Sequence, residues 1–471
     1  MFDEQTLRNT IDHVVRIDRG GTVTVSDAAR LRDGVVERLV RHAVFAEKPE
    51  VRDASRWLIR RLGEAVGVTS ASIVELYKAR GRGECGGFTV PAINIRTLTY
   101  DTARAAMRAA KKLDAGAVVF EIARSEIRYT EQRPAEYSAA VTAAAIQEDF
   151  RGPLFIQGDH FQASASAFYK GDREKELAAL RALIEEALAA GFLNIDIDSS
   201  TLVVLDRPTI DAQQEENCQI AAELTAHVLR HTPAGVEVSI GGEIGEVGGK
   251  NSTVEELRAY MRGYRRHLDR VAPGAFGISK ISVQTGTTHG GLPLADGTIA
   301  KVAIDFDTLR ELSVIARREF GMSGAVQHGA STLPEELFGK FPEVETAEIH
   351  LATGFQNLTY DHPRFPADLR QAMYEHLARA HADERKAGMS DQQFYYKTRK
   401  QALGPFKRQM WDLPTDVRAA LGAALERTFD DIFSRLRIKG TRALVDRFVK
   451  PVPTTPPLAE QIAAVFALKG V

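Results

Sequence analysis

The middle of the chain alternates short apolar runs with longer segments in which apolar residues recur every three or four positions. The short runs are continuous or nearly so, which is typical of strands that are buried on both faces. The longer segments carry charge opposite their apolar face, which predicts amphipathic helices, and several of them end at glycine. The eight predicted strands are FTVPAINI (88–95), AGAVVFEI (115–122), PLFIQGDH (153–160), FLNIDIDSS (192–200), GVEVSIGGEIG (235–245), ISKISVQTGT (278–287), GAVQHGA (324–330) and TAEIHLATG (346–354).

Eight strand–helix units in succession predict an α/β fold, a (β/α)₈ TIM barrel with helical N-terminal and C-terminal extensions. An open doubly wound sheet is the structural alternative, but no G-x-G-x-x-G motif follows the first strand. Residues 1–82 show helical patterns only, and a Pro-rich stretch at 450–461 leads to a short tail that docks on the body or on a neighbour. We therefore predict a helical extension at 1–70, a barrel carrying the metal site at 71–382, and a helical arm and tail at 383–471.

Composition excludes several classes of function. The chain has 471 residues and a formal net charge of −2, so no whole-protein field attracts nucleic acid or an anionic membrane. Cys85 and Cys218 are too few for a disulfide framework or a cysteine-based zinc site. The charged N-terminus has no apolar signal-peptide core, and no run of 18 apolar residues occurs. We therefore expect a cytoplasmic protein with no nucleic-acid partner and no membrane partner.

Three histidines stand directly after predicted strands. His160, His289 and His328 follow the third, sixth and seventh strands, each beside glycine or aspartate. The carboxyl ends of barrel strands meet at one mouth, where the catalytic groups of such barrels lie. A single histidine there is usually structural, whereas three imidazoles and an open position make up a catalytic zinc site, with Glu243 as a fourth or alternate ligand. The open position would polarise a substrate carbonyl or hydroxyl.

Other polar residues at these strand ends are weaker signals. Asp159 is a candidate general acid or base, or the partner that orients an imidazole. Asp198 is a candidate for orienting a ligand or for a second cation. His350, in the eighth strand, is equally compatible with a site role and a structural role. Glycines at the strand ends offer N–H donors to a phosphate, although glycine is also common there for turn reasons.

The motifs G-D-H, I-D-x-S, G-x-E-I-G-x-x-G-G, T-H-G and H-G-x-S follow one another in this order along the chain. The ordered set resembles the class II (zinc-dependent) fructose-bisphosphate and tagatose-bisphosphate aldolases, from about Ser72 to Arg399. The segment FYYKTRKQAL (394–403) is similar to the C-terminal arm of the longer, dimeric branch of that family. Residues 1–70 have no counterpart in the resemblance.

The resemblance implies an aldehyde-lyase of carbohydrate metabolism, as in glycolysis. It would reversibly cleave a ketose (bis)phosphate such as fructose 1,6-bisphosphate to dihydroxyacetone phosphate and an aldehyde, with one Zn²⁺ per chain stabilising the enediolate. A monovalent cation is a further candidate, and a homodimer or higher homo-oligomer is expected. By resemblance, the zinc ligands are His160, His289 and His328 with Glu243 beside the metal, and Asp159 exchanges a proton with the substrate hydroxyl. The residues expected to bind substrate are Asn94, Gly290, Gly329, Ser331, His350, Thr353 and Arg399.

Three departures from the family pattern affect the choice of substrate. The family's mobile loop usually carries a proton-moving glutamate where this sequence reads GGKN (248–251), so Glu246 or Glu255 would replace it. The eighth strand ends in HLAT (350–353) in place of N-x-D-T, and GLP (291–293) replaces a usual lysine. The metal ligands are retained while the phosphate contacts change, which favours a divergent aldolase acting on a different ketose phosphate.

Two further alternatives stay open. A metal-dependent hydrolase on the same fold would use a zinc-bound hydroxide, but such barrels commonly carry H-x-H at the first strand, which here ends AINIR (92–96). A non-catalytic metal-binding paralogue is the other alternative, and the missing loop glutamate favours it.

Overall fold

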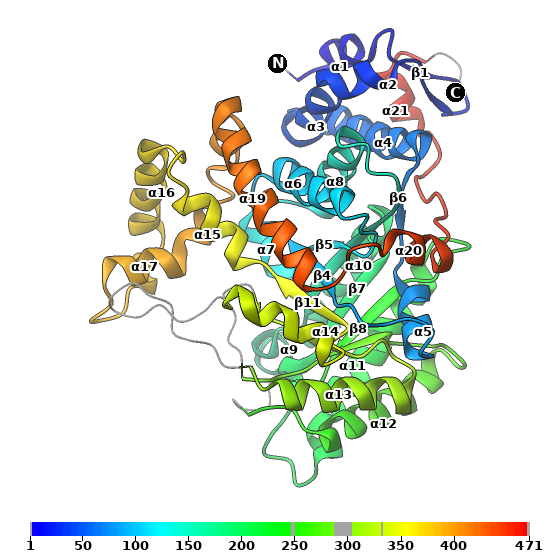
Figure 1. Ribbon diagram of the computed structural model, residues 1–471, viewed down its shortest axis with the longest axis vertical. Helices are drawn as coiled ribbons and strands as arrows, with labels where there is room; N and C mark the ends of the chain where they lie inside the picture. The colour runs from blue at the N-terminus through cyan, green and yellow to red at the C-terminus, as the bar shows by residue number, and fades with distance from the viewer. Residues whose placement is uncertain (1, 246–249, 287–303, 331–332, 469–471) are drawn as a thin grey trace.

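Eight parallel strands close into a barrel in the computed structural model, which describes residues 2–245, 250–286, 304–330 and 333–468 (Figure 1). Each strand pairs with the next along the chain, and β11 pairs with β4 to close the ring. The predicted (β/α)₈ fold and all eight predicted strands are confirmed. The barrel strands are β4 (Val90–Asn94), β5 (Val119–Ala123), β6 (Gly152–Gln162), β7 (Asn194–Asp198), β8 (Ser239–Glu243), β9 (Lys280–Ser282), β10 (Ala325–Gln327) and β11 (Glu348–Leu351).

Helices surround the barrel and connect its strands. α19 (Thr415–Arg435), which follows β11 after a long excursion, packs against the first barrel helix α6, and Arg108 of α6 pairs with Glu426 of α19 at 2.5 Å. The outer layer therefore contains helices from both sides of residue 382, and the predicted division of the chain at residues 70 and 382 stays a prediction. The connecting helices are α6 (Thr99–Lys112), α7 (Arg124–Tyr129), α8 (Pro134–Gln147), α9 (Ala165–Lys170), α10 (Arg173–Ala189), α11 (Ile210–His231), α12 (Val254–Val271), α13 (Phe306–Phe320) and α14 (Lys340–Glu343).

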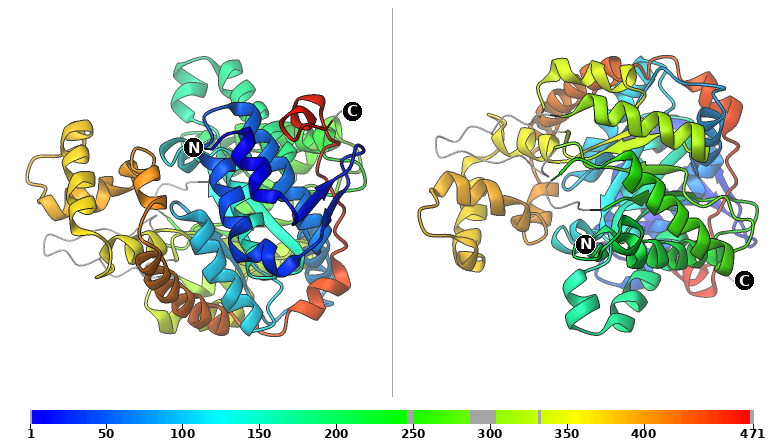
Figure 2. Two further views of the ribbon diagram at one scale, coloured as in Figure 1. Left: turned by 90° about the horizontal axis from the view of Figure 1, so that it is seen from above. Right: turned by 90° about the horizontal axis from the view of Figure 1, so that it is seen from below.

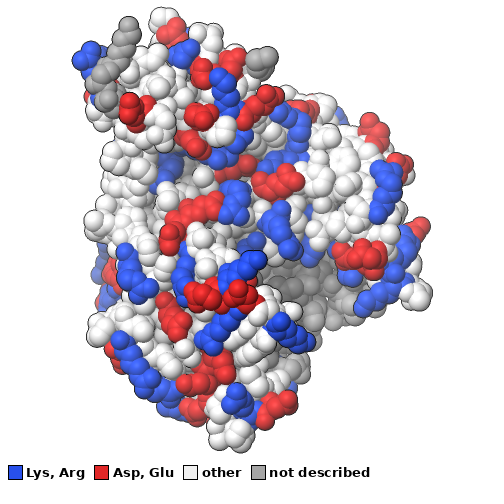
Figure 3. All heavy atoms as spheres, turned by 180° about the vertical axis from the view of Figure 1, so that it is seen from behind, with Lys and Arg blue, Asp and Glu red and all other residues white. Residues whose placement is uncertain are grey.

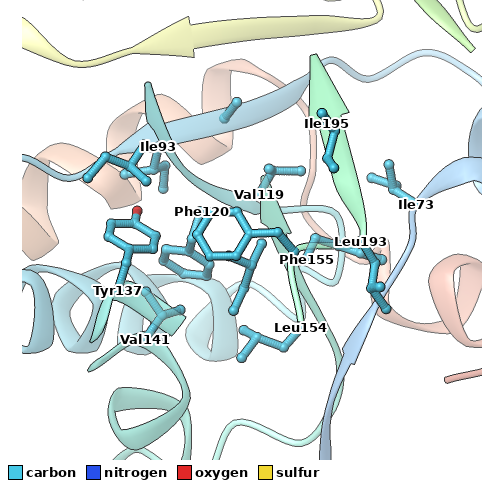
Figure 4. Close-up of a cluster of buried hydrophobic side chains, with 14 of the residues drawn as sticks. Ile73, Ile93, Val119, Phe120, Tyr137, Val141, Leu154, Phe155, Leu193 and Ile195 are labelled. Carbon is cyan, nitrogen blue, oxygen red and sulfur yellow. The ribbon is translucent and has the colours of Figure 1, made fainter. Parts of the chain in front are cut away.

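The apolar core lies between the strands and this helical layer. Phe120, which faces outward from β5, is 1% exposed and packs toward α8, which supplies Tyr137 and Val141 (Figure 4). Tyr137 keeps its hydroxyl satisfied by donating to the backbone oxygen of Glu121 at 2.6 Å. β-Branched and aromatic residues favour strands that pack in this way on a helical layer, which explains why these runs form the barrel.

Helix α5 (Val74–Gly81) covers the amino-terminal end of the barrel. The Arg80 guanidinium, 1% exposed, donates to the backbone oxygen of Thr346 at 2.9 Å just before β11. The Tyr77 hydroxyl reaches into the barrel and donates to Glu348. The interior is thus closed at this end by the side chains of Tyr77 and Arg80, which hydrogen-bond to Glu348 and to the chain just before β11.

We expect Gly81→Ala to destabilise the protein by about 1–3 kcal/mol, as overpacking of a tight contact does. A Cβ at Gly81 would overlap the backbone carbonyl of Gly321 and lie 3.0 Å from the Met322 oxygen, and neither backbone atom can rotate away. Gly339→Ala is the matched control, since a Cβ there meets nothing within 4 Å. Urea unfolding of both variants checks this, and equal midpoints would contradict the expectation.

The N-terminal region differs from its prediction. Residues 1–82 were expected to be helical only, and this prediction is wrong at three short strands. β1 (Val15–Ile17) and β2 (Val23–Val25) form an antiparallel pair. β3 (Val68–Ala71) pairs with the start of β6 and so extends the barrel sheet. Strands of three or four residues are too short for their periodicity to stand out between helices. The helices here are α1 (Glu4–Ile11), α2 (Ala28–Arg30), α3 (Val36–Phe45) and α4 (Pro49–Val66).

The Pro-rich tail docks on these N-terminal helices. It follows α20 (Arg442–Phe448), runs along α4 and ends in α21 (Glu460–Val465), which contacts α4 (Figure 1). The Trp57 indole donates to the Pro456 oxygen at 3.0 Å, and the Thr455 hydroxyl donates to Glu64 at 2.6 Å. The tail was expected to dock on the body of the protein or on a neighbouring molecule, and in the structure it docks on the body.

A group of helices after β11 projects to one side of the barrel (Figure 2). It has a small apolar cluster of its own, which includes Tyr360, Met373, Phe394 and Met410. Among the described residues, every helix is too short or too polar to cross a membrane. The projecting helices are α15 (Thr353–Asp361), α16 (Ala367–Ala380), α17 (Asp391–Thr398) and α18 (Lys407–Trp411).

Candidate active site

A pocket of about 1170 Å³ opens at the carboxyl ends of the barrel strands. Positive and negative side chains are intermixed over the face drawn in Figure 3, so no broad region of one sign gathers there. Inside the pocket, by contrast, ionisable groups are concentrated. The lining residues that matter below are Asn94, Arg96, Glu121, Arg128, Asp159, His160, His328, Gly329, His350, Thr353 and Lys400.

An irregularity in β6 sets the positions of Asp159 and His160. The register with β7 shifts between Gly158 and Phe161, so β6 carries one extra residue there, and His160 has a φ of 40°. A positive φ is uncommon for a residue with a Cβ and is held only where the surroundings enforce it. Both consecutive side chains therefore line the pocket, whereas a regular strand would point them to opposite faces.

His160, Glu243 and His328 bring their ligand atoms within 4.8 Å of one another. The His160 and His328 ring centroids are 4.2 Å apart, and His160 Nδ1 lies 3.3 Å from Glu243. His160 Nδ1 also lies 2.8 Å from Asp198 Oδ2, in the arrangement by which a carboxylate orients a metal-binding imidazole. Two imidazole nitrogens and one carboxylate oxygen are donors of the kind and number that bind Zn²⁺. The third predicted histidine, His289, lies outside the described residues.

The charges of this cluster depend on one another. Burial, then Asp198, raises the pKa of Glu243 to about 7. Burial also opposes a charge on His160, but Asp159 and Glu243 raise the pKa of its imidazole well above the usual range. Burial, followed by the neighbouring His350 and His160, holds the pKa of His328 well below its usual range. His328 is therefore neutral, the form in which histidine binds a metal.

A polar layer lies beneath these residues inside the barrel. Lys280 is 1% exposed and pairs with Glu348, with Asp196 at 2.9 Å and with the Gln157 oxygen at 2.8 Å. Space for the Lys280–Asp196 pair depends on Gly241, because a Cβ there would overlap the Asp196 carboxylate. Barrel interiors are usually filled by branched apolar side chains, so this charged layer is a specific feature of the chain.

The other side of the pocket is cationic. Arg96 pairs with Glu126 at 2.6 Å and donates to the Thr353 hydroxyl at 3.2 Å. Asn94 donates to the same Glu126 at 2.5 Å. These contacts fix the positions of Asn94, Arg96 and Thr353, which line this side of the pocket. Arg128 and Lys400 line the pocket as well and make no ion pair with any described residue.

The structure brings some of the predicted site residues together and not others. Asn94, Gly329, His350 and Thr353 line the same pocket as Asp159, His160 and His328. Glu246, His289, Gly290 and Ser331 lie outside the described residues, so their roles stay predictions. Arg399 does not line the pocket, because its guanidinium pairs with Asp361 at 2.9 Å and lies 4.9 Å from the Tyr396 ring centroid. Its predicted phosphate contact stays untested.

Sequence reasoning missed the polar layer and the guanidinium of Arg96. Glu121, Lys280 and Glu348 each stand inside a predicted barrel strand, and that was the available signal, because a charge in a buried strand needs a buried partner. Which charges meet depends on the closed register of the barrel.

Comparison with known proteins decides the family. Residues 76–410 match the family model described as "Fructose-bisphosphate aldolase class-II". The chain belongs to this family. The resemblance read from the motifs is thereby confirmed, and membership supports the activity of an aldolase, a carbon–carbon lyase, acting on sugar phosphates. No curated protein matches the chain.

One solved structure shows a similar fold at low identity. A protein described as a probable tagatose 6 phosphate kinase from Sinorhizobium meliloti is 19% identical with a TM-score of 0.51, covering 81% of this aldolase-family chain and 98% of its own. A fructose-bisphosphate aldolase from Campylobacter jejuni is 16% identical with a TM-score of 0.48, covering 79% and 96% of the two chains.

Proposed function

We propose that the chain is a metal-dependent class II aldolase that reversibly cleaves a ketose phosphate, such as fructose 1,6-bisphosphate, to dihydroxyacetone phosphate and an aldehyde. His160, Glu243, His289 and His328 would hold one Zn²⁺. The observation that carries the proposal is the β6 irregularity, which lets Asp159 and His160 line one pocket beside His328. Bound there, Zn²⁺ would supply a Lewis acid for the negative charge that develops beside the substrate carbonyl.

Asp159 is the group proposed to move the first proton. Burial opposes ionisation of its carboxyl, but His160 and His350 lower its pKa well below the usual range, so it is an acceptor. It would take the proton from the hydroxyl next to the bond being cleaved, while the bonding electrons pass to the carbonyl-bearing half and the aldehyde leaves. His350 Nδ1, 3.1 Å from Asp159 Oδ1, holds the carboxylate in place. Glu246 stays the candidate for the second proton transfer.

The substrate's phosphate would lie against the cationic side of the pocket. Arg128 and Lys400 offer positive charge that no described carboxylate neutralises. His350 and Ala352 line the pocket where the family pattern has asparagine and aspartate, which supports a ketose other than fructose 1,6-bisphosphate as the better substrate. The expected homodimer or higher oligomer stays a prediction.

Chelator removal of the metal tests the proposed function. We expect the purified enzyme to cleave at least one member of a panel of ketose mono- and bisphosphates, to lose this activity with chelator, and to regain it when Zn²⁺ is restored. Full activity in chelator would contradict the metal requirement. Zinc binding without cleavage of any ketose would favour the non-catalytic paralogue.

A second prediction concerns Lys400. We expect Lys400→Met to raise KM for the sugar phosphate by about 10–100-fold with a smaller change in kcat, since a charge-assisted hydrogen bond contributes about 1.5–3 kcal/mol. Lys397→Met is the matched control, because Lys397 pairs with Glu384 at 3.3 Å and does not line the pocket. Steady-state kinetics of both variants check this. An unchanged KM in Lys400→Met would remove Lys400 from the phosphate site.

A further inference from the structure

Two histidines and a glutamate meet between the outer helices α10 and α11. His227 and His231 stand four residues apart on α11, so both face the same side of that helix, and Glu185 of α10 lies against them. Their ligand atoms come within 4.8 Å of one another. None of these three residues lines the pocket at the mouth of the barrel, so the group has no part in the proposed aldol reaction.

One carboxylate oxygen of this group faces both imidazoles. Glu185 Oε1 lies 2.9 Å from His227 Nε2 and 3.7 Å from His231 Nε2, and the two ring centroids are 4.2 Å apart. Donors at about 2.0–2.2 Å from a tetrahedral ion stand about 3.4 Å from one another, a value between these two separations. The Glu185 side chain is 49% exposed, so a small rotation of it would admit an ion.

The backbone orients the ring of His231. Its Nδ1 lies 2.9 Å from the His227 backbone oxygen, which only accepts, so Nδ1 carries the hydrogen. When the ring is neutral, the lone pair is on Nε2 and faces the Glu185 oxygen at 3.7 Å, too far for a hydrogen bond. A backbone carbonyl that fixes the tautomer in this way is a usual partner of a metal-binding histidine. A lone pair and a carboxylate oxygen that face each other favour a cation between them.

The second imidazole, that of His227, is available in its neutral form. Burial, followed by the neighbouring His231, lowers the pKa of His227 below its usual range. Without an ion, Nε2 of His227 donates to Glu185. No described residue bonds its Nδ1, so the ring hydrogen can pass to Nδ1 and leave the Nε2 lone pair for a metal.

We propose that Glu185, His227 and His231 form a divalent transition-metal site that ties α10 to α11. Two imidazoles and one carboxylate suit Zn²⁺, Ni²⁺ or Cu²⁺, whereas Mg²⁺ prefers ligands that are all oxygen. Water would complete the coordination, because the His231 side chain is 41% exposed. An ion that binds only the folded protein stabilises it, so the site would hold the two helices together.

Counting bound ions tests the site. The full-length protein is stripped with chelator and dialysed to equilibrium against Zn²⁺, and the ions per chain are measured. We expect His227→Asn and His231→Asn each to bind one ion fewer than the wild type, a difference that Mg²⁺ should not produce. Glu185→Gln should weaken this binding by at least about 10-fold, because even the partners of metal ligands contribute 10–100-fold. Circular dichroism confirms folding, and the exposed position of His231 keeps the test intact if His227→Asn does not fold.

A similar pair on the neighbouring helix provides the control. His267 Nε2 lies 3.0 Å from Glu215, but no second described histidine forms an ion pair with that glutamate. His267→Asn should therefore bind as many ions as the wild type. An equal loss in His267→Asn and His231→Asn, or no loss in either His227→Asn or His231→Asn, would overturn the proposal.

Histidine modification examines this site separately from the active site. Diethyl pyrocarbonate should modify the exposed His231 in the metal-free protein, and saturating Zn²⁺ should abolish that modification, as measured by mass spectrometry of the peptide. His13, with a side chain that is 78% exposed, should react equally with and without Zn²⁺. Equal reactivity of His231 in both conditions would overturn the proposal.

These measurements also separate the site from the proposed aldolase activity. Protection of His231 by Zn²⁺ in a protein that cleaves no ketose would retain this site and reject the proposed reaction. Chelator-sensitive cleavage in a protein whose His231 is never protected would do the reverse.

Discussion

We expect Asp159→Asn to lower kcat for aldol cleavage by about 10²–10⁴-fold, the usual contribution of a general base, with a smaller change in KM. An asparagine has the shape of the aspartate but cannot accept the hydroxyl proton. The contacts of Asp159 with His328 and His350 show that the carboxylate faces the pocket beside the proposed metal ligands. Steady-state kinetics with the best ketose phosphate check this.

Two controls accompany this variant. Asp206→Asn changes an exposed aspartate outside the pocket and should leave kcat unaltered. Metal analysis should show that Asp159→Asn binds as many ions per chain as the wild type, so that a lost ion at the His160 site does not explain the slower reaction. A kcat within tenfold of the wild type, with metal bound, would exclude Asp159 as the proton acceptor.

The second large effect is expected on stability. Lys280→Met removes the cation of the polar layer and leaves Asp196 and Glu348 buried without it. Breaking a buried ion pair from one side typically costs about 3–5 kcal/mol, so we expect a loss of this size in the free energy of unfolding. Urea unfolding at fixed metal content measures it.

A surface ion pair gives the comparison for Lys280. Lys112 pairs with Asp430 at 2.7 Å, but its side chain is 66% exposed, so Lys112→Met should move the unfolding midpoint far less. Adding Glu348→Gln to Lys280→Met should recover part of the loss, because the charge left unpaired is then neutral. Equal midpoints for Lys280→Met and Lys112→Met would show that the buried pair adds no stability.

The barrel was predictable from sequence because each of its strands has a recognisable local sequence pattern. Runs such as AGAVVFEI at 115–122 are too apolar to face water and too short for a helix, and eight of them alternate with amphipathic helices. The positions of His160 and His328 followed from the rule that strand ends meet at one mouth. Family membership confirmed the resemblance that the ordered motifs indicated.

The interior of the barrel was not predictable in the same way. Whether Glu121 faces inward depends on its strand register, and the pairing of Lys280 with Glu348 joins strands that are separated by β10. The β6 irregularity also shifts, by one position, the residues that face the pocket, and no local sequence pattern indicates this shift. Side chains that meet only when a sheet closes are set by the closed structure rather than by neighbouring residues in sequence.

The tail across α4 has a consequence for synthesis. Trp57 and Pro456 are 399 residues apart, and a ribosome adding about 5–20 residues per second needs about 20–80 s to make the chain between them. Throughout that interval the side of α4 that carries Trp57 and Glu64 has no cover from the tail, so the Trp57 indole and the Glu64 carboxylate lack the tail contacts that they make in the folded protein. Docking of residues 454–466 can therefore begin only after the barrel residues have been synthesised.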